Sequence, residues 1–168
     1  AVTPKSTYTD LIILLVVGTL WHYLYDWTGG NDLIAVVAPI NESVWEHLKL
    51  GYGGTIMLVV LDVVRRRANT YILGRVVGLV AMNLLIVVGF YGYFSVLGRP
   101  FLPFDLALFV LGCFVAWRLA VVVETKPLIS LAAWTSWLGW LMFILVGMVF
   151  GLFTVQPPEA EIFVPFPH

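Results

Sequence analysis

The chain has 168 residues, of which 61% are hydrophobic and 11% charged, and its mean hydropathy is +0.96. Soluble domains carry about 25% charged residues, so this composition excludes an ordinary soluble domain and a disordered chain. A single cysteine excludes a disulfide scaffold, and a formal net charge of −1 offers no basic surface for nucleic acid. We therefore expect an integral membrane protein that has the lipid bilayer as its main partner.

Five apolar segments each reach the roughly 20 residues that a membrane-spanning helix needs. Breaks rich in glycine, proline and charged residues separate them, and the segments cover residues 10–28, 42–64, 73–97, 104–123 and 130–153. No small-residue cleavage site follows the first segment, so we expect it to be retained. The pattern predicts an all-α integral membrane protein with a single domain over residues 1–168, built as a five-transmembrane-helix bundle.

Lysine and arginine set the predicted orientation by the positive-inside rule. With a cytoplasmic N-terminus, only Lys49 and Arg99 face the outside, and seven of the nine basic residues face the inside: Lys5, Arg65, Arg66, Arg67, Arg75, Arg118 and Lys126. The rule predicts a multi-pass protein of the plasma (inner) membrane, with its C-terminus outside. The 29–40 loop and the Pro-rich 154–168 tail are expected to cover the outer face.

Polar residues gather near the outer ends of the first two segments. His22 and Asp26 are spaced i,i+4 on one predicted helix, and Glu42 and Glu46 have the same spacing on the next. At about 1.5 Å per residue, His22 on the first helix and Glu46 and His47 on the second lie roughly 7–10 Å below the outer surface. Ionisable groups at this depth usually face a cavity or a partner, so a hairpin is expected to bring them to one level.

This cluster predicts a divalent metal site, since imidazole and carboxylate ligands suit zinc, iron or manganese. The predicted ligands are His22, Asp26, Glu42, Glu46 and His47, with Asn41 and Ser43 as further polar members. One interpretation is a membrane-embedded hydrolase that acts on a lipid or another membrane-located substrate. In it, Glu46 or Glu42 is the catalytic general base toward a metal-bound water.

Two other interpretations remain open. Ser43-x-x-Glu46 has the spacing of a helix capping box, and the metal motif HExxH is absent. In that case the segment only fixes the hairpin and docks a partner, as in a non-catalytic membrane subunit or scaffold. Alternatively, His22 and His47 hold a haem, or the aromatic residues contact a quinone. The sequence leaves open whether the protein is an enzyme.

Pairs of small residues predict where helices approach each other closely. Gly74-x-x-x-Gly78 and Gly147-x-x-x-Gly151 have the spacing that brings helix backbones together in membranes. Such pairs serve packing within one chain or between copies, so a homo-oligomer or a membrane protein partner is a further expectation.

Two segments, WHYLYDW at 21–27 and PINESVWEHLKL at 39–50, carry a resemblance. They are similar to an uncharacterised family of small prokaryotic multi-pass membrane proteins, a domain of unknown function with a PxNESxWEHxKL signature. The resemblance implies a fold over the whole chain and a site at these segments, but no activity. Glu159 stands where similar family tails have a histidine, which implies that a carboxylate replaces a ligand here if that histidine binds metal.

Overall fold

The computed structural model describes residues 6–65, 70–126 and 133–166, and within these ranges it contains helices and no strand. The elements are α1 (Tyr8–Trp21), α2 (Leu24–Trp27), α3 (Asp32–Ala35), α4 (Val44–Val64), α5 (Thr70–Leu97), α6 (Leu102–Thr125), α8 (Ala133–Val155) and the 3₁₀-helix η1 (Glu161–Phe163). The all-α prediction is confirmed for this part of the chain.

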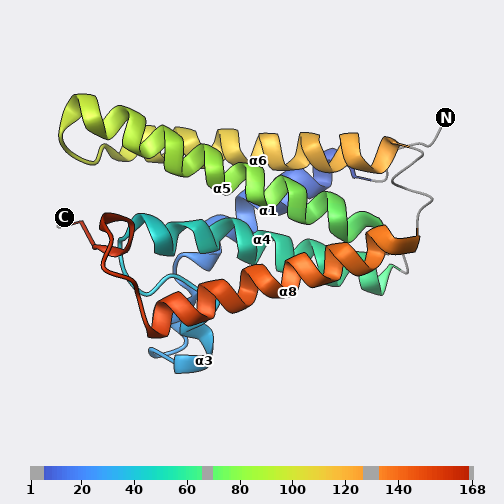
Figure 1. Cartoon of the computed structure of the whole chain (residues 1–168), viewed down its shortest axis with the longest axis horizontal. Helices are drawn as coiled ribbons and strands as arrows, with labels where there is room; N and C mark the ends of the chain where they lie inside the picture. The colour runs from blue at the N-terminus through green and yellow to red at the C-terminus, as the bar shows by residue number, and fades with distance from the viewer. Residues whose placement is uncertain (1–5, 66–69, 127–132, 167–168) are drawn as a thin grey trace.

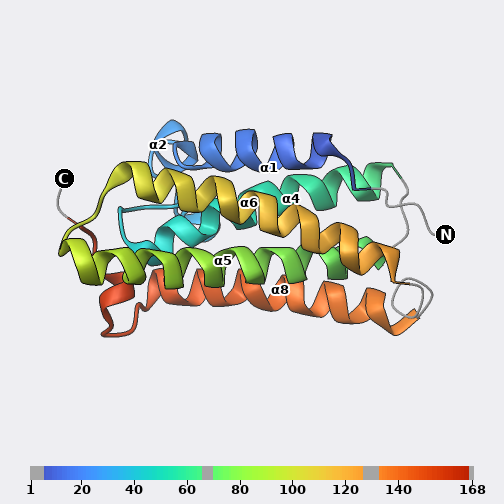
Figure 2. The ribbon, with the colours of Figure 1, turned by 90° about the horizontal axis from the view of Figure 1, so that it is seen from above.

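The long helices run side by side along the length of the molecule, and the two chain ends lie at opposite ends of the bundle (Figures 1 and 2). Helix α1 packs against α4 and α6, and α5 packs against α4, α6 and α8. Helix α4 buries most of its length, including its glycines, between α1, α5 and the other elements that pack on it.

Four helices in the described residues are long and apolar enough to cross a membrane: α4, α5, α6 and α8. The prediction of five spanning helices is therefore not supported. Helix α1 has only 14 residues, which at 1.5 Å per residue gives about 21 Å, short of the roughly 30 Å of a bilayer core.

The first predicted helix, 10–28, is broken at His22. The amides of His22 and Tyr23 bond to Thr19 and Leu20, three residues back, which tightens the helix and ends it. The Trp21 ring lies over Gly53 of α4, and its indole N–H donates to the Val37 carbonyl. This long-range anchor lies where the helix ends, and the chain then makes the separate short helix α2.

The remaining helix boundaries fall within a few residues of the predicted ones. The 29–40 loop contains α3, and the tail folds back as predicted: Phe163 packs on Trp45 and Phe166 packs on Phe90. Several residues used in the predictions lie outside the described ranges, so those parts are not placed: Lys5, Arg66, Arg67, residues 130–132 and residues 167–168.

The outer surface of the bundle is apolar. Helix α8 exposes large hydrophobic side chains along its length, with Trp137 79% and Met148 63% exposed. A soluble monomer rarely exposes such a continuous apolar surface. Together with the four long apolar helices, this surface fits a membrane protein.

Small residues bring α5 and α6 together. A Cβ atom added at Gly74 would lie 3.2 Å from the Ala120 carbonyl oxygen, and one at Gly78 would clash with the Ala116 carbonyl. The predicted close approach is thus confirmed, and it lies between two helices of the same chain. Gly147 of α8 has a similar role, because the Tyr52 hydroxyl of α4 occupies the space that a Cβ atom would need there.

Candidate functional site

Three polar side chains converge at the end of the bundle that carries α2 and α3. His22 comes from the turn after α1, Glu42 from the loop before α4, and His47 from the first turn of α4. One ligand atom from each of them lies within 4.8 Å of the others. Their side chains are about one-third exposed, so water and ions can reach the cluster.

Glu42 lies between the two histidines. Its Oε1 is 3.5 Å from His22 Nε2, and its Oε2 is 3.2 Å from His47 Nε2. The two imidazole rings stack with their centroids 5.4 Å apart and their planes 26° apart. One carboxylate therefore faces two imidazole nitrogens, each through a different oxygen.

The backbone of α4 fixes the orientation of His47. Its Nδ1 lies 2.8 Å from the Ser43 carbonyl oxygen, and a carbonyl only accepts, so Nδ1 carries the hydrogen. The other nitrogen, Nε2, therefore faces Glu42 either protonated, as an imidazolium, or with its lone pair free for a cation. Histidines that bind metal show this same outer hydrogen bond to a carbonyl or carboxylate.

The separations around Glu42 are longer than those of ordinary ion pairs. Charge-assisted N–H···O bonds are usually about 2.7–2.9 Å long, and the two contacts of Glu42 are longer, at 3.2 and 3.5 Å. Because each histidine faces a different oxygen of Glu42, one ion could contact both histidines and this carboxylate at these separations only if both oxygens take part. Two imidazoles and one carboxylate are groups that could hold a metal ion.

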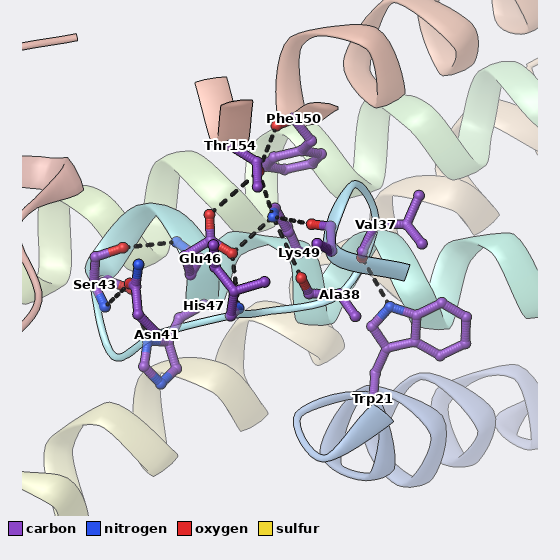
Figure 3. A network of polar contacts seen from close by, with 12 residues as sticks. Trp21, Val37, Ala38, Asn41, Ser43, Glu46, His47, Lys49, Phe150 and Thr154 are labelled. Atoms are coloured by element: carbon purple, nitrogen blue, oxygen red, sulfur yellow. Dashed lines mark hydrogen bonds and ion pairs between the residues drawn. The ribbon is translucent and has the colours of Figure 1, made fainter. Parts of the chain in front are cut away.

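Glu46 lies apart from this cluster, although it was a predicted ligand and general base. Its Oε2 accepts from the Ile40 amide at 3.0 Å and from Lys49 Nζ at 2.7 Å, and Thr154 contacts its other oxygen. Figure 3 shows the side chains of Glu46 and His47 leaving α4 in different directions. Adjacent helical residues point about 100° apart, so only one of them faces α1.

The Lys49 ammonium group is fully buried and saturated with acceptors. Besides Glu46, the carbonyl oxygens of Ala35 and Ala38 and the Thr154 hydroxyl lie 2.8, 3.3 and 2.6 Å from Nζ, so its three N–H groups are shared among four acceptors. These contacts join α4 to the loop around α3 and to α8 (Figure 3). Lys49 thus fixes the loop that supplies Glu42, a role that the sequence analysis did not predict.

Of the two hydrogen bonds that define a capping box, only one is present at the start of α4. Ser43 is the N-cap of α4, and its hydroxyl accepts from the Glu46 amide at 3.3 Å. The Ser43 amide, however, donates to the Asn41 side chain at 2.9 Å and not to Glu46. Asn41 therefore completes the cap, which leaves the Glu46 carboxylate for Lys49.

Asp26 does not join the cluster. The predicted i,i+4 pairing with His22 required one continuous helix, but the break between α1 and α2 lies between these two residues. The Asp26 side chain is exposed. Of the predicted ligands, the structure thus brings together His22, Glu42 and His47 and leaves Asp26 and Glu46 outside.

The histidine geometry does not favour the haem interpretation. Axial haem ligands approach the iron from opposite faces of the porphyrin. Here the two rings stack on each other and face one carboxylate. The arrangement suits a small ion better than a porphyrin.

A further acidic residue, Asp105, lies in the first turn of α6. Its Oδ1 accepts from the Tyr93 hydroxyl of α5 at 2.5 Å. The sequence analysis did not include these residues in the site. Asp105 follows Pro103 in the first turn of a predicted helix, and this position at the same end of the bundle was the available signal.

The comparisons with known proteins agree with the expectation of an uncharacterised family. No curated protein matches the chain, and no solved structure matches it either. The sequence over residues 2–165 matches a family described as a family of unknown function, DUF6512. This match covers all three residues of the cluster and nearly the whole chain, so the protein belongs to the DUF6512 family of unknown function.

Proposed function

We propose that this protein binds a divalent metal ion through His22, Glu42 and His47 at one end of a membrane helix bundle. The observation that carries the proposal is the convergence of three ligand atoms within 4.8 Å. Two imidazoles and one carboxylate are a ligand set that proteins use for zinc and for iron(II). We include manganese as the third metal that this site would bind.

Three protein ligands leave coordination positions for water or a substrate. The chemical role that we propose is hydrolysis of a membrane-located substrate such as a lipid, because an ion of this kind polarises an ester or phosphate oxygen and activates water. The contacts of Glu46 with Lys49 and Thr154 do not favour it as the general base. Glu42, which faces both histidines, is better placed as a ligand.

We propose further that the bundle crosses the plasma membrane with the cluster on the outer side and the N-terminus inside. The positive-inside distribution supports this orientation, and the two chain ends lie at opposite ends of the bundle (Figure 1). Labelling of single cysteines with a membrane-impermeant maleimide tests it. A cysteine at exposed Asp26 should react in intact cells, and one at exposed Arg65 should react only after lysis.

Metal analysis tests the proposed site. The protein is purified in mild detergent without chelator, and zinc, iron and manganese are measured by elemental mass spectrometry. We expect about one ion per chain in the wild type and a loss of at least tenfold in His22→Ala, His47→Ala and Glu42→Gln. Asp26→Asn is the matched control, because Asp26 is an exposed acid at the same end, and it should keep the ion.

The outcomes separate this function from a scaffold role. If the wild type binds no ion, even after incubation with zinc, iron(II) or manganese, the cluster is a set of hydrogen bonds that fixes the hairpin. Co-purification of a stoichiometric membrane protein would then support the non-catalytic subunit.

A further inference from the structure

Three helices meet in one layer below the proposed metal site. A Cβ atom added at Gly18 of α1 would lie 2.8 Å from the Phe109 ring of α6 and 3.2 Å from the Leu50 carbonyl oxygen of α4. This glycine thus lets α4 and α6 approach α1 together. The contact fixes how the next turn of each helix is placed.

One turn further toward the same end, each of these chain segments carries an ionisable residue. His22 follows Gly18 by four residues, His47 precedes Leu50 by three, and Asp105 precedes Phe109 by four. One turn of α-helix rises about 5.4 Å, so the three residues lie at nearly the same level.

Asp105 is held in place on one side only. Its Oδ1 accepts the Tyr93 hydroxyl at 2.5 Å, and that hydroxyl in turn accepts from the Phe101 amide at 3.3 Å. Within the described part of the chain, no hydrogen bond engages Oδ2. Asp105 is half-buried and is not one of the three converging ligands, so it lies outside the ligand shell.

We propose that Asp105 accepts a hydrogen bond from the water on the open side of the ion bound by His22, Glu42 and His47. Tyr93 orients the carboxylate, which makes Asp105 a positioning residue and not a ligand. This proposal rests on the metal site proposed above and extends it to α5 and α6. It follows that the open coordination position faces α6.

Cobalt(II) is the probe for the test, because its visible spectrum reports the ligands and the exchange of bound water. The full-length protein in detergent is titrated with Co²⁺ and then with azide, an anion that replaces the water. For Asp105→Asn, we expect Co²⁺ to bind about 10–100-fold more weakly, as for other residues outside the ligand shell. Azide should bind at least about tenfold more tightly, because a negative charge no longer repels it.

Three further variants make the test specific. Asp26→Asn removes an exposed acid at the same end of the bundle and should leave both affinities unchanged. Tyr93→Phe keeps the negative charge but frees the carboxylate, so Co²⁺ should bind more weakly, by a smaller factor than in Asp105→Asn, and azide binding should stay close to the wild-type value. Asp105→Glu retains the negative charge and should keep azide binding close to the wild-type value.

The results distinguish failure of the metal site from failure of the role proposed for Asp105. If the wild type gives no Co²⁺ spectrum, the metal site itself fails and this inference fails with it. If the wild type and Asp26→Asn bind Co²⁺ and Asp105→Asn matches them in both titrations, only this inference is overturned. If Asp105→Asn does not fold, Tyr93→Phe decides: an unchanged Co²⁺ affinity overturns the inference, and a weakened one supports it.

Discussion

Lys49 Nζ lies 2.7 Å from Glu46 Oε2, one helical turn away on α4, and the two side chains are 0% and 4% exposed. The adjacent residue, His47, points in a different direction from α4 and faces Glu42. The sequence puts three charged or ionisable groups on this turn. The structure divides them into a buried ion pair that holds the loop and an accessible group that faces the proposed metal.

Glu46→Gln should destabilise the protein strongly. A Gln side chain would leave the Lys49 ammonium buried without a counter-charge, and breaking a buried pair in this way costs about 3–5 kcal/mol. If Glu46 served only as a capping residue, the change would be nearly silent. Unfolding in detergent, followed by circular dichroism, measures the effect, and Glu159→Gln on the exposed tail is the control.

The double variant Glu46→Gln/Lys49→Met checks that the two residues act as a pair. Removing both charges should cost less than the sum of the two single changes, with a coupling of about 1–3 kcal/mol. Additive costs in the same unfolding experiment would show that the two side chains contribute independently.

Arg75→Leu should also destabilise the protein strongly. Arg75 lies at the other end of the bundle from Lys49. The Arg75 guanidinium, 2% exposed, bonds Asp10 Oδ2 at 2.7 Å and Asp62 Oδ2 at 3.1 Å. Its loss leaves two buried carboxylates without this cation, for which we expect a cost of about 3–5 kcal/mol. Arg65→Leu, at an exposed arginine of the same end, should change the melting temperature little.

Gly78→Ala should separate α5 from α6. The added methyl group would meet the Ala116 backbone carbonyl, which cannot move aside as a side chain can, so we expect a loss of about 1–3 kcal/mol. Gly92→Ala is the matched control on the same helix, because a Cβ atom there meets nothing within 4 Å. Alanine favours a helix over glycine by about 1 kcal/mol, so the control should be neutral or stabilising in thermal unfolding.

Metal binding should raise the stability of the wild type and not that of the His47→Ala variant. An ion that binds only the folded state, at 100 times its dissociation constant, adds about 2.7 kcal/mol. Thermal melts with increasing zinc measure this shift. Equal shifts in the wild type and in His47→Ala would place the zinc elsewhere on the protein.

The sequence by itself determined the helical, apolar character of the protein and the ends of its later helices. These features depend on local properties: composition, apolar segment length and the turn residues between segments. It also placed His22, Glu42 and His47 in one polar group, because a hairpin brings the end of one helix beside the start of the next.

Only the tertiary structure decided which acids belong to that group. Glu46 turns away because Thr154, more than 100 residues later in the chain, and two loop carbonyls surround Lys49. The first helix ends at Trp21, whose ring rests on Gly53, and this break removes Asp26 from the face of His22. Spacing along a continuous helix fixes which residues share a face, but the partner of that face depends on packing between segments far apart in sequence.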